Sequence, residues 1–515
     1  GRACLQLFTW PRRLSGTGSA ARFRRVFWLP TLLRSDDGRS ASFTSFGGLR
    51  RLEIDGLSLL LYPASELESG LAGIWLRLLD GAAAVPLPLL DPATEASSYV
   101  DGESYRRAGV WRDLEWQTSF SFPADGPSWR WQISVRNRGT EAVRMDTVHA
   151  ADIALAPYSA VRCNEYFVSQ YLDITPLSTS THGTCLAVRQ NMPGPRVPWV
   201  LLGSATGAAG WATDALQLSG CPGEPALTGL RSATLPNARL QHEHTLATLA
   251  SEPVLLEPGE TWDGGYFGCF VADHPAASFA ADAALTGLAG AVIPLDAPTT
   301  DPLEPSPRNL FAAAPVASVV ELSTDELARL ADGPIEVTES CDGRWWEAVA
   351  EDGTVWVSAA KETAVLRPHG QILRTGHSLS PDSAALTVTV WMSGTFASQL
   401  TQGHAGRTPM LSAARTYLGA QPAHGLRCFV RLDERWHLLG RPSAWGLTPH
   451  GARWLYALPG ELLEIAVEAP TTEHRLPGEV RRTGSAGAPV LLAAQLATGG
   501  DDGQGSDGPE LTFEP

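Results

Sequence analysis

Hydrophobic and polar side chains alternate along most of the chain from about Phe43 onward, a pattern typical of β-strands with one face in a core. In residues 114–122 every second side chain is Leu, Trp, Thr or Phe, and Glu, Gln or Ser stands between them. The same period returns in residues 129–135 after a Pro-Ala-Asp-Gly-Pro turn. These segments predict a hairpin with one aromatic face. A turn at 137–140 and a strand through Val143 and Met145 extend it to a meander.

The second half of the chain shows the same strand pattern. Trp345 and Trp346 precede a turn at 351–354, which leads into apolar residues 355–357. Further apolar segments at 386–391 and 454–458 also predict strands. We therefore expect a second sheet domain.

Helical signals are few. An Ala-rich stretch at 275–292, a capping box formed by Ser323 and Glu326, and residues 410–417 predict three short helices. Six prolines between 294 and 315 are typical of a linker between domains. The predicted fold is mainly β, with two antiparallel β-sandwich domains and few short helices.

These patterns predict five consecutive regions. They are an irregular Arg-rich segment (1–42), a β domain (43–293), a Pro-rich linker (294–315), a second β domain (316–498) and an acidic Gly/Asp-rich tail (499–515). The first 35 residues hold seven Arg and no carboxylate. Such a start fits a transit segment, an expression scar or the edge of an incomplete reading frame, and we expect the last.

Charge and cysteine content limit the classes of binding partner and the cellular compartments that we expect for the protein. With 39 Lys and Arg against 55 Asp and Glu, the formal charge is −16, which repels a nucleic-acid backbone. No uncharged apolar run of about 18 residues is present, so we expect no membrane span. The seven Cys form no CxxC pair. Scattered reduced thiols favour a reducing, cytoplasmic location.

Carbohydrate chemistry is the strongest local signal. Residues 164–173 and 189–191 combine aromatic rings, on which sugar C–H faces pack, with carboxylates and amides that bind hydroxyls. The candidate substrate-binding residues are Glu165, Tyr166, Gln170, Tyr171, Asp173, Arg189, Gln190 and Asn191, and Trp199 is a further candidate ring. The alternative is structural, with the Tyr and Gln side chains of a buried sheet bonded to backbone and Arg189 paired internally with one of the carboxylates.

Other motifs give less information about function. No GxSxG, HExxH, P-loop or CxxC motif is present, and the glycines of 203–210 lack dinucleotide-loop spacing. His242 and His244 share a strand face and could bind a metal, but no further ligands can be named. We therefore assign no catalytic residue, no metal ligand and no cofactor.

A family resemblance rests on motifs in both halves of the chain. They are residues 164–173, 189–191, Trp199, 235–237, 241–243, 267–268 and 273–275, then 367–370, 391–403, 442–443 and 453–454. Over about residues 43–490 the sequence resembles the N-terminal part of the 1,2-β-oligoglucan phosphorylases. These proteins belong to glycoside hydrolase family 94 and are related to cellobiose phosphorylase and cyclic β-1,2-glucan synthases.

The resemblance implies two β-sandwich domains, the first a galactose-mutarotase-like supersandwich, ahead of an (α/α)6 barrel. That barrel would supply the general acid of an inverting phosphorolysis of β-1,2-glucooligosaccharides, with inorganic phosphate as nucleophile and α-glucose 1-phosphate as product. Three short helices cannot form such a barrel. We therefore expect a non-catalytic N-terminal portion of such an enzyme, inactive alone, with the missing barrel as its intramolecular partner and a β-glucan oligosaccharide as candidate ligand.

Two alternatives stay open at the level of sequence. One is a free-standing carbohydrate-binding or interaction protein with this fold. The other is a mutarotase-like enzyme that uses His242 or His182 together with Glu165 or Glu243.

Overall fold

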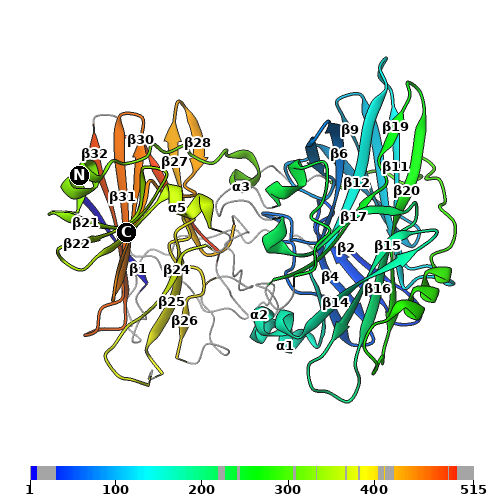
Figure 1. Cartoon of the computed structure of the whole chain (residues 1–515), viewed down its shortest axis with the longest axis horizontal. Helices are drawn as coiled ribbons and strands as arrows, with labels where there is room; N and C mark the ends of the chain where they lie inside the picture. Colours follow the sequence, from blue (N-terminus) through cyan, green and yellow to red (C-terminus); the bar gives the residue numbers. More distant parts are fainter. Residues whose placement is uncertain are drawn as a thin grey trace, which may run out of the picture. The chain divides into compact units, whose positions relative to one another are not determined.

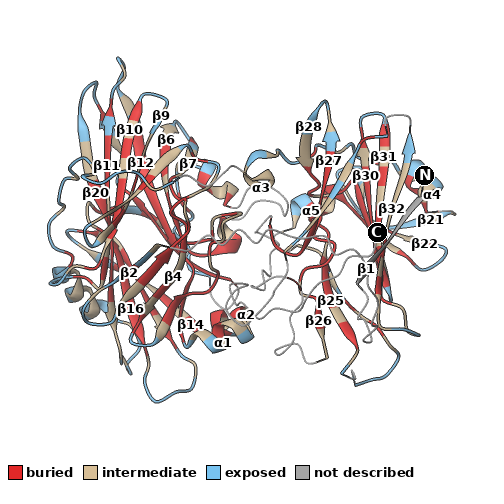
Figure 2. Ribbon diagram, turned by 180° about the vertical axis from the view of Figure 1, so that it is seen from behind, coloured by how far each residue is buried: buried red, intermediate tan, exposed pale blue. Residues whose placement is uncertain are grey.

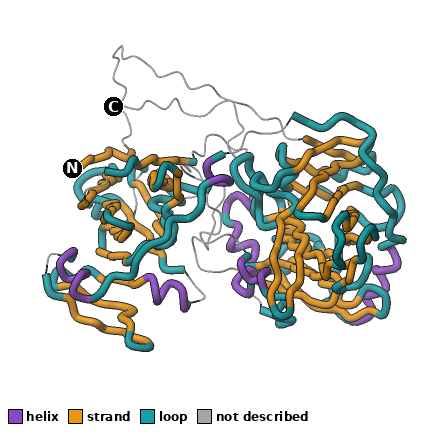
Figure 3. Tube along the Cα trace, turned by 90° about the horizontal axis from the view of Figure 1, so that it is seen from above, coloured by secondary structure: helices purple, strands orange, loops and turns teal. Residues whose placement is uncertain are grey.

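The computed structural model describes residues 2–8, 31–218, 227–240, 244–304, 309–331, 333–365, 368–380, 383–403, 411, 423–484 and 487–495. The chain divides into two compact units, each built mainly from antiparallel sheets (Figures 1 and 3). The first domain comprises Phe27–Gly220 and Ala226–Ala313. The second domain comprises Gly1–Val26, Cys221–Pro225 and Ala314–Pro515. The main division after Ala313 falls inside the predicted linker.

The first domain is a sandwich of two sheets. The larger sheet has the strand order β7-β6-β12-β18-β17-β15-β16-β20-β11-β10-β9-β8, with β14 on β15 and β19 on β12. Its strands are β6 (Gly73–Asp80), β7 (Ala83–Pro88), β8 (Ala96–Asp101), β9 (Ser104–Trp111), β10 (Leu114–Ser121), β11 (Trp129–Asn137), β12 (Val143–Ala151), β14 (Leu172–Thr179), β15 (Gly183–Gln190), β16 (Trp199–Ser204), β17 (Ala208–Asp214), β18 (Thr245–Ser251), β19 (Val254–Leu256) and β20 (Thr261–Val271).

The smaller sheet packs against the larger one through aromatic rings. It has the order β13-β5-β4-β3-β2 and consists of β2 (Thr31–Arg34), β3 (Ser40–Phe43), β4 (Leu49–Ile54), β5 (Leu57–Leu60) and β13 (Ile153–Ala156). Phe43 of this sheet stacks on Tyr105 of the larger sheet at 4.3 Å between ring centroids. The core of this domain therefore contains residues of both sheets, whose strands carry many of the buried stretches in Figure 2.

The predicted aromatic hairpin is confirmed. Strands β10 and β11 pair antiparallel, with Phe120 opposite Trp131 and Thr118 opposite Ile133. All four side chains are buried. Alternation predicted this hairpin correctly because each strand has one face in the core.

Two stretches that we expected to be irregular are ordered against sheets. Residues 31–34 form β2, and residues 40–43 form β3, which begins inside the predicted irregular segment and ends one residue beyond it. Residues 2–8 form β1 (Arg2–Phe8), which pairs with β32 (Leu476–Gly484). Part of the predicted linker lies along β8, since the Leu303 N–H donates to the Ser98 carbonyl at 2.7 Å. Short strands of four residues are too brief for their alternation to be recognised.

The second domain also contains several antiparallel sheets around its own core. The longest has the order β1-β32-β31-β30-β29-β23-β22-β21, and two smaller sheets have the orders β24-β25-β26 and β28-β27-β33. The strands are β21 (Ile335–Cys341), β22 (Arg344–Ala350), β23 (Val355–Ser358), β24 (Gly370–Arg374), β25 (Leu386–Trp391), β26 (Thr401–Gln402), β27 (Leu426–Leu432), β28 (Arg435–Leu438), β29 (Ala444–Thr448), β30 (Gly451–Leu458), β31 (Glu461–Glu468) and β33 (Val490–Ala494). The mainly-β sandwich prediction is confirmed.

The helices are short in both domains. They are α1 (Tyr158–Cys163), α2 (Glu165–Gln170), α3 (Leu310–Ala313), α4 (Thr324–Leu330) and α5 (Ala359–Ala364), with 3-10 turns η1 (Ala215–Gln217), η2 (Thr228–Arg231) and η3 (Ala280–Leu288). The capping box is confirmed, because Ser323 caps α4. The Ala-rich stretch forms the 3-10 helix η3 rather than an α-helix. Residues 410 and 412–417 lie outside the described residues.

The lengths of the helices can be compared with the length that a membrane span requires. Within the ranges that the structure describes, no helix has both the length and the apolar character needed to cross a bilayer.

Candidate functional site

The carbohydrate motif folds into α2 and the strand that follows it. Asn164 caps this helix, because its side-chain oxygen accepts a hydrogen bond from the Phe167 N–H at 3.1 Å. Glu165 is the first helical residue and is buried at 0% exposure. Phe167 points outward at 45% exposure and meets the Tyr171 ring edge-on at 5.0 Å. The motif therefore has a buried carboxylate and an aromatic outer surface.

A polar cluster lies buried around Glu165. The Arg162 guanidinium of α1 is 3.4 Å from the Glu165 carboxylate and also donates to the Leu61 carbonyl. Tyr62, which follows β5, is fully buried. Burial, with the negative charges of Glu165 and Asp152 as further causes, raises the pKa of its hydroxyl well above the ordinary value.

Asp152 and His244 complete this cluster. Asp152 accepts a hydrogen bond from the Tyr62 N–H at 2.7 Å. The His244 ring stacks on the Tyr62 ring at 5.1 Å. Burial raises the pKa of Asp152 to about 7 and lowers that of His244 to about 4. Tyr62 thus contacts a carboxyl group of raised pKa through its backbone and an imidazole of lowered pKa through its ring.

Several polar atoms of the cluster are left without partners among the described residues. They are the Tyr62 hydroxyl, Asp152 Oδ1 and both ring nitrogens of His244. Each such buried atom costs about 1–3 kcal/mol. The groups have acid–base character, but all of them are buried. No group of three or more His, Cys, Asp or Glu side chains suited to a metal occurs in the part of the chain that the structure describes.

The sequence pattern did not find this cluster. Tyr62 and Asp152 are 90 positions apart in the chain, and neither belongs to a recognisable motif. His244 was considered only as a metal ligand. Only the pairing of β13 with β5 brings these segments together.

The predicted residues at the end of β15 have structural partners. The Gln190 side chain donates to the Ala154 carbonyl at 2.9 Å and accepts from the Met192 N–H at 3.0 Å. Arg189 donates to the carbonyls of His274 and Pro275 at 3.0 and 2.6 Å and also to the side chain of Asn191. The Gln190 contact with backbone matches the structural alternative, whereas Arg189 donates to backbone carbonyls and to Asn191 rather than to a carboxylate.

The other predicted residues are more accessible. Asp173 pairs with Arg239, and Tyr166, Gln170 and Tyr171 are half-buried. Trp199 is fully buried and donates to the Ser278 hydroxyl at 2.9 Å, so its ring offers no surface for a sugar. Tyr166, Tyr171 and the exposed Phe167 form what we call the α2 face.

The histidine and glutamate pairs of the mutarotase-like alternative are not brought together where the structure describes them. His182 lies in the β14–β15 turn, whereas Glu165 lies before the start of β14. The eight residues of β14 extend over about 26 Å. His182 is itself buried against Ser204, whose carbonyl is 2.9 Å from its Nδ1. His242 and Glu243 lie outside the described residues.

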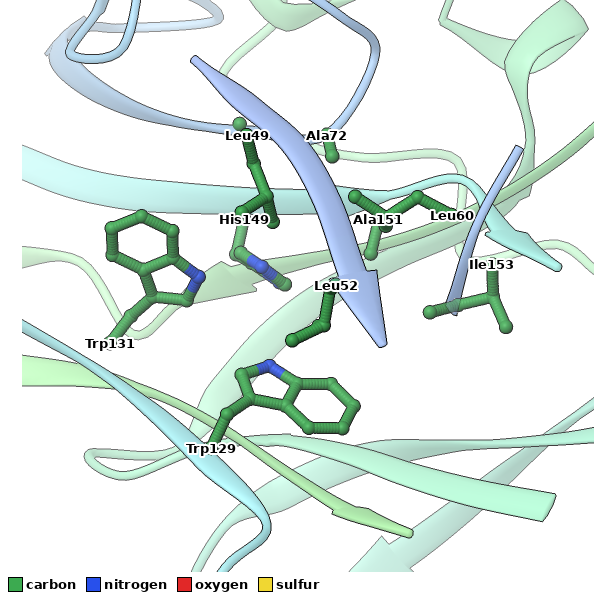
Figure 4. Close-up of a pocket in the computed structure, with 10 residues that line it drawn as sticks. Leu49, Leu52, Leu60, Ala72, Trp129, Trp131, His149, Ala151 and Ile153 are labelled. Carbon is green, nitrogen blue, oxygen red and sulfur yellow. The ribbon is translucent and has the colours of Figure 1, made fainter. Parts of the chain in front are cut away.

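A small gap lies between the two sheets of the first domain, lined by Trp129, Trp131 and His149 among others (Figure 4). Its volume is about 10 Å³, close to the minimum for a single water molecule. Burial lowers the pKa of His149 to about 4. This gap is too small for a sugar.

An open groove on the first domain is much larger, at about 620 Å³. Its lining residues are Asp37, Arg39, Ile54, Asp55, Pro123, Ala124, Gly126, Ser128, Arg196, Phe270 and Ala272. We call it the Asp37–Asp55 groove. None of these residues stood out in the sequence, because they come from five separated segments.

Comparison with known proteins finds family matches in both domains. Residues 42–266 match the family described as the SOGP N-terminal domain, and residues 350–502 match the glycoside phosphorylase supersandwich domain. A 1,2-β-oligoglucan phosphorylase of Listeria innocua serovar 6a is 28% identical over 432 residues. The chain resembles the N-terminal β-sandwich region of 1,2-β-oligoglucan phosphorylase-like proteins. The resemblance inferred from sequence is thereby confirmed.

The match has two further features. It covers 83% of this chain but only 38% of the Listeria relative. The supersandwich description belongs to the family matched by residues 350–502, in the second domain, whereas the sequence resemblance had placed this description on the first.

Two solved structures match this chain with low TM-scores. A putative aldose 1-epimerase from Escherichia coli K12 is 11% identical, with a TM-score of 0.30, and covers 47% of this chain and 99% of its own. A putative kojibiose phosphorylase from the human microbiome is 10% identical, with a TM-score of 0.28, and covers 50% of this chain and 32% of its own.

Proposed function

We propose that this chain is a non-catalytic N-terminal portion of a glycoside phosphorylase of glycoside hydrolase family 94. The whole enzyme would cleave β-1,2-glucooligosaccharides with inorganic phosphate and invert the anomeric carbon. The observation that carries this proposal is the ordered pair of family matches, together with the Listeria relative named a 1,2-β-oligoglucan phosphorylase. Most of that relative lies outside the matched region.

The chemistry of the described residues supports a non-catalytic role. Inverting phosphorolysis needs a carboxylic acid that reaches the glycosidic oxygen in an accessible site. Asp152 titrates in a suitable range, but it is fully buried. The carboxylates of the Asp37–Asp55 groove lie next to arginines, and the neighbouring Arg39 lowers the pKa of Asp37 to about 2. An acid of that strength is ionised at neutral pH and cannot donate a proton.

An activity assay tests this proposal directly. The chain is incubated with α-glucose 1-phosphate and sophorose, and released phosphate is measured against the Listeria phosphorylase as positive control. We expect no release above buffer from this chain. Clear turnover would show that the chain holds its own catalytic acid, and the non-catalytic proposal would be abandoned.

We further propose that the α2 face contacts the (α/α)6 barrel that the family resemblance implies. Accessible aromatic rings are typical anchors of protein interfaces, and the exposed Phe167 with the half-buried Tyr171 supplies them here. The barrel domain, produced separately and mixed with this chain, should slow hydrogen exchange in 165–173. Phe167→Ser should remove that protection, whereas Phe279→Ser, at a similarly exposed phenylalanine, should keep it. Protection that survives Phe167→Ser contradicts this contact.

A further inference from the structure

We propose that the Asp37–Asp55 groove is a binding site for a neutral oligosaccharide, separate from the α2 face. Every residue that lines it belongs to the first domain. Its volume of about 620 Å³ falls within the range of small-ligand sites. The choice of a β-1,2-linked glucan as ligand rests on the proposed function. The assignment of the groove as a site for a neutral ligand rests on its contacts and charges.

One wall of the groove is held rigid by Arg39. Its Nε is 2.8 Å from Asp37 Oδ1, and its two terminal nitrogens donate to the carbonyls of Ser128 and Pro123 at 2.8 and 3.0 Å. This arginine therefore ties the β2–β3 turn to the β10–β11 loop. The hydroxyl of Ser128 also accepts from the Phe270 N–H at 2.9 Å. A preorganised wall lowers the entropy cost of binding.

Asp55 and Arg196 form another part of the lining. They pair at 2.6 Å between Asp55 Oδ2 and Arg196 Nη1, and about half of each side chain stays exposed. Asp55 takes a left-handed backbone conformation (φ 53°) at the tip of the β4–β5 turn. The next residue, Val197, donates its N–H to Asp273 at 2.9 Å, which fixes the loop that carries Arg196.

The charges of the groove favour a neutral ligand. Two carboxylates (Asp37 and Asp55) face two guanidiniums (Arg39 and Arg196), so the formal charges cancel. Each nitrogen of the Arg39 guanidinium already donates within the protein, so three of its five N–H groups are taken up.

The remaining hydrogen-bonding capacity suits hydroxyl groups. The hydrogen bonds of Asp37 converge on Oδ1, and those of Asp55 on Oδ2. The second oxygen of each carboxylate is therefore available to accept hydrogen bonds. The half-buried Phe270 ring, with Pro123, supplies an apolar surface for the C–H face of a sugar. Ionised acceptors beside an aromatic ring are the groups that recognise a neutral polyol.

The test is a titration of the intact chain with sophorose and longer β-1,2-glucooligosaccharides, followed by calorimetry and ligand-observed NMR. Cellobiose and laminaribiose serve as other neutral ligands, and inorganic phosphate serves as the anion. We expect saturable binding of at least one neutral oligosaccharide, and none of phosphate in the groove. The double variant Asp37→Asn/Asp55→Asn should weaken binding at least tenfold.

Matched controls separate this site from the rest of the chain. Asn tolerates the left-handed backbone at position 55, so Asp55→Asn should fold normally. Asp342→Asn, in the second domain with φ 50°, makes the same chemical change at a similar turn and should bind sugar as wild type does. Tyr171→Ala removes a ring of the α2 face and should also leave binding unchanged.

The outcomes distinguish the two proposals. If no neutral oligosaccharide binds, the proposal of a binding site in the groove is overturned. It is also overturned if the Tyr171→Ala variant loses binding while the double variant still binds. Binding of cellobiose or laminaribiose without any β-1,2-glucan, lost in the double variant, supports the groove but contradicts the proposed substrate class. The groove proposal is also overturned if the chain binds phosphate more tightly than the neutral oligosaccharides and the double variant changes that phosphate binding.

Discussion

At the scale of single residues, the buried cluster makes stability depend on pH in two opposite directions. Burial raises the pKa of Asp152 to about 7, so its contribution to stability is complete below about pH 4 and lost as pH rises through 7. Burial lowers the pKa of His244 to about 4, so its contribution is complete above about pH 6.5 and lost as pH falls through 4. Separate substitutions can isolate each effect.

The first prediction concerns Asp152→Asn, which keeps an acceptor for the Tyr62 N–H. Between pH 4 and 7 the wild-type chain should lose on the order of 4 kcal/mol relative to this variant, because only Asp152 must ionise in a buried site. Urea unfolding at both pH values measures the difference. His244→Gln should show the opposite trend, with wild type losing stability relative to the variant as pH falls from 6.5 to 4. A pH-independent difference for Asp152→Asn contradicts the assigned burial.

Residue patterns predicted some contacts of the candidate site and missed others. The backbone partner of Gln190 agrees with one predicted alternative, because side chains of a buried sheet commonly bond to backbone. The same alternative paired Arg189 with a carboxylate, and the structure instead gives it backbone carbonyls as acceptors. Tyr62, Asp152 and His244 could not be foreseen as a group. Their proximity comes from strand pairing between distant segments, which a local pattern does not encode.

At the scale of elements, one strand pair depends on a glycine. Gly265 of β20 lies opposite Gln132 of β11 with φ 157°, and a Cβ there would be 2.0 Å from the Trp131 carbonyl oxygen. No side chain can be accommodated without separating the two strands.

Gly265→Ala should therefore lower the free energy of unfolding by several kcal/mol or prevent folding of the first domain. Gly259→Ala is the control, since its φ is also positive (82°) but nothing lies within 4 Å of the added Cβ. That change should cost about 1 kcal/mol. Equal unfolding midpoints in urea for the two variants would refute the close contact at Gly265.

A buried ion pair joins two strands to a loop. Arg77 of β6 pairs with Asp146 of β12 at 2.5 Å and donates to the carbonyls of Leu230, Ser232 and Ala233. The alternating pattern did not indicate that this arginine is buried, because a charged residue is expected on the exposed face of a strand.

Arg77→Met should destabilise the chain by about 3–5 kcal/mol, because it leaves the Asp146 carboxylate buried without its partner. Arg138→Met provides the comparison, since the Arg138–Glu115 pair is largely exposed and should contribute less than about 1 kcal/mol. Chemical denaturation of both variants measures the two costs. Similar losses of stability in the two variants would contradict the expectation that burial makes the Arg77–Asp146 pair more important for stability.

At the scale of the whole molecule, each domain has its own hydrophobic core. Leu463 is fully buried in the second domain, and Leu249 is buried in the first. Domains with separate cores generally fold as units. A cavity made in one core should therefore loosen mainly the strands of that domain.

We expect Leu463→Ala to cost about 2–5 kcal/mol and to accelerate hydrogen exchange in β30 and β31. Exchange in β10 and β11 should stay unchanged. Leu249→Ala should produce the reverse pattern. Exchange mass spectrometry resolves both sets of peptides. Acceleration in both domains by either substitution alone contradicts separate folding units.

The sequence by itself determined the mainly-β class, the aromatic hairpin of β10 and β11 and the capped helix α4, because alternation and capping are local. The many ordered motifs also sufficed for the family resemblance. Only the folded chain shows that Arg189 and Gln190 hydrogen-bond to backbone carbonyls, that Tyr62, Asp152 and His244 share a buried cluster, and that Asp37 and Asp55 line one groove. These facts depend on which distant segments pair and how deeply each side chain is buried. Burial and long-range pairing arise only when the sheets pack together.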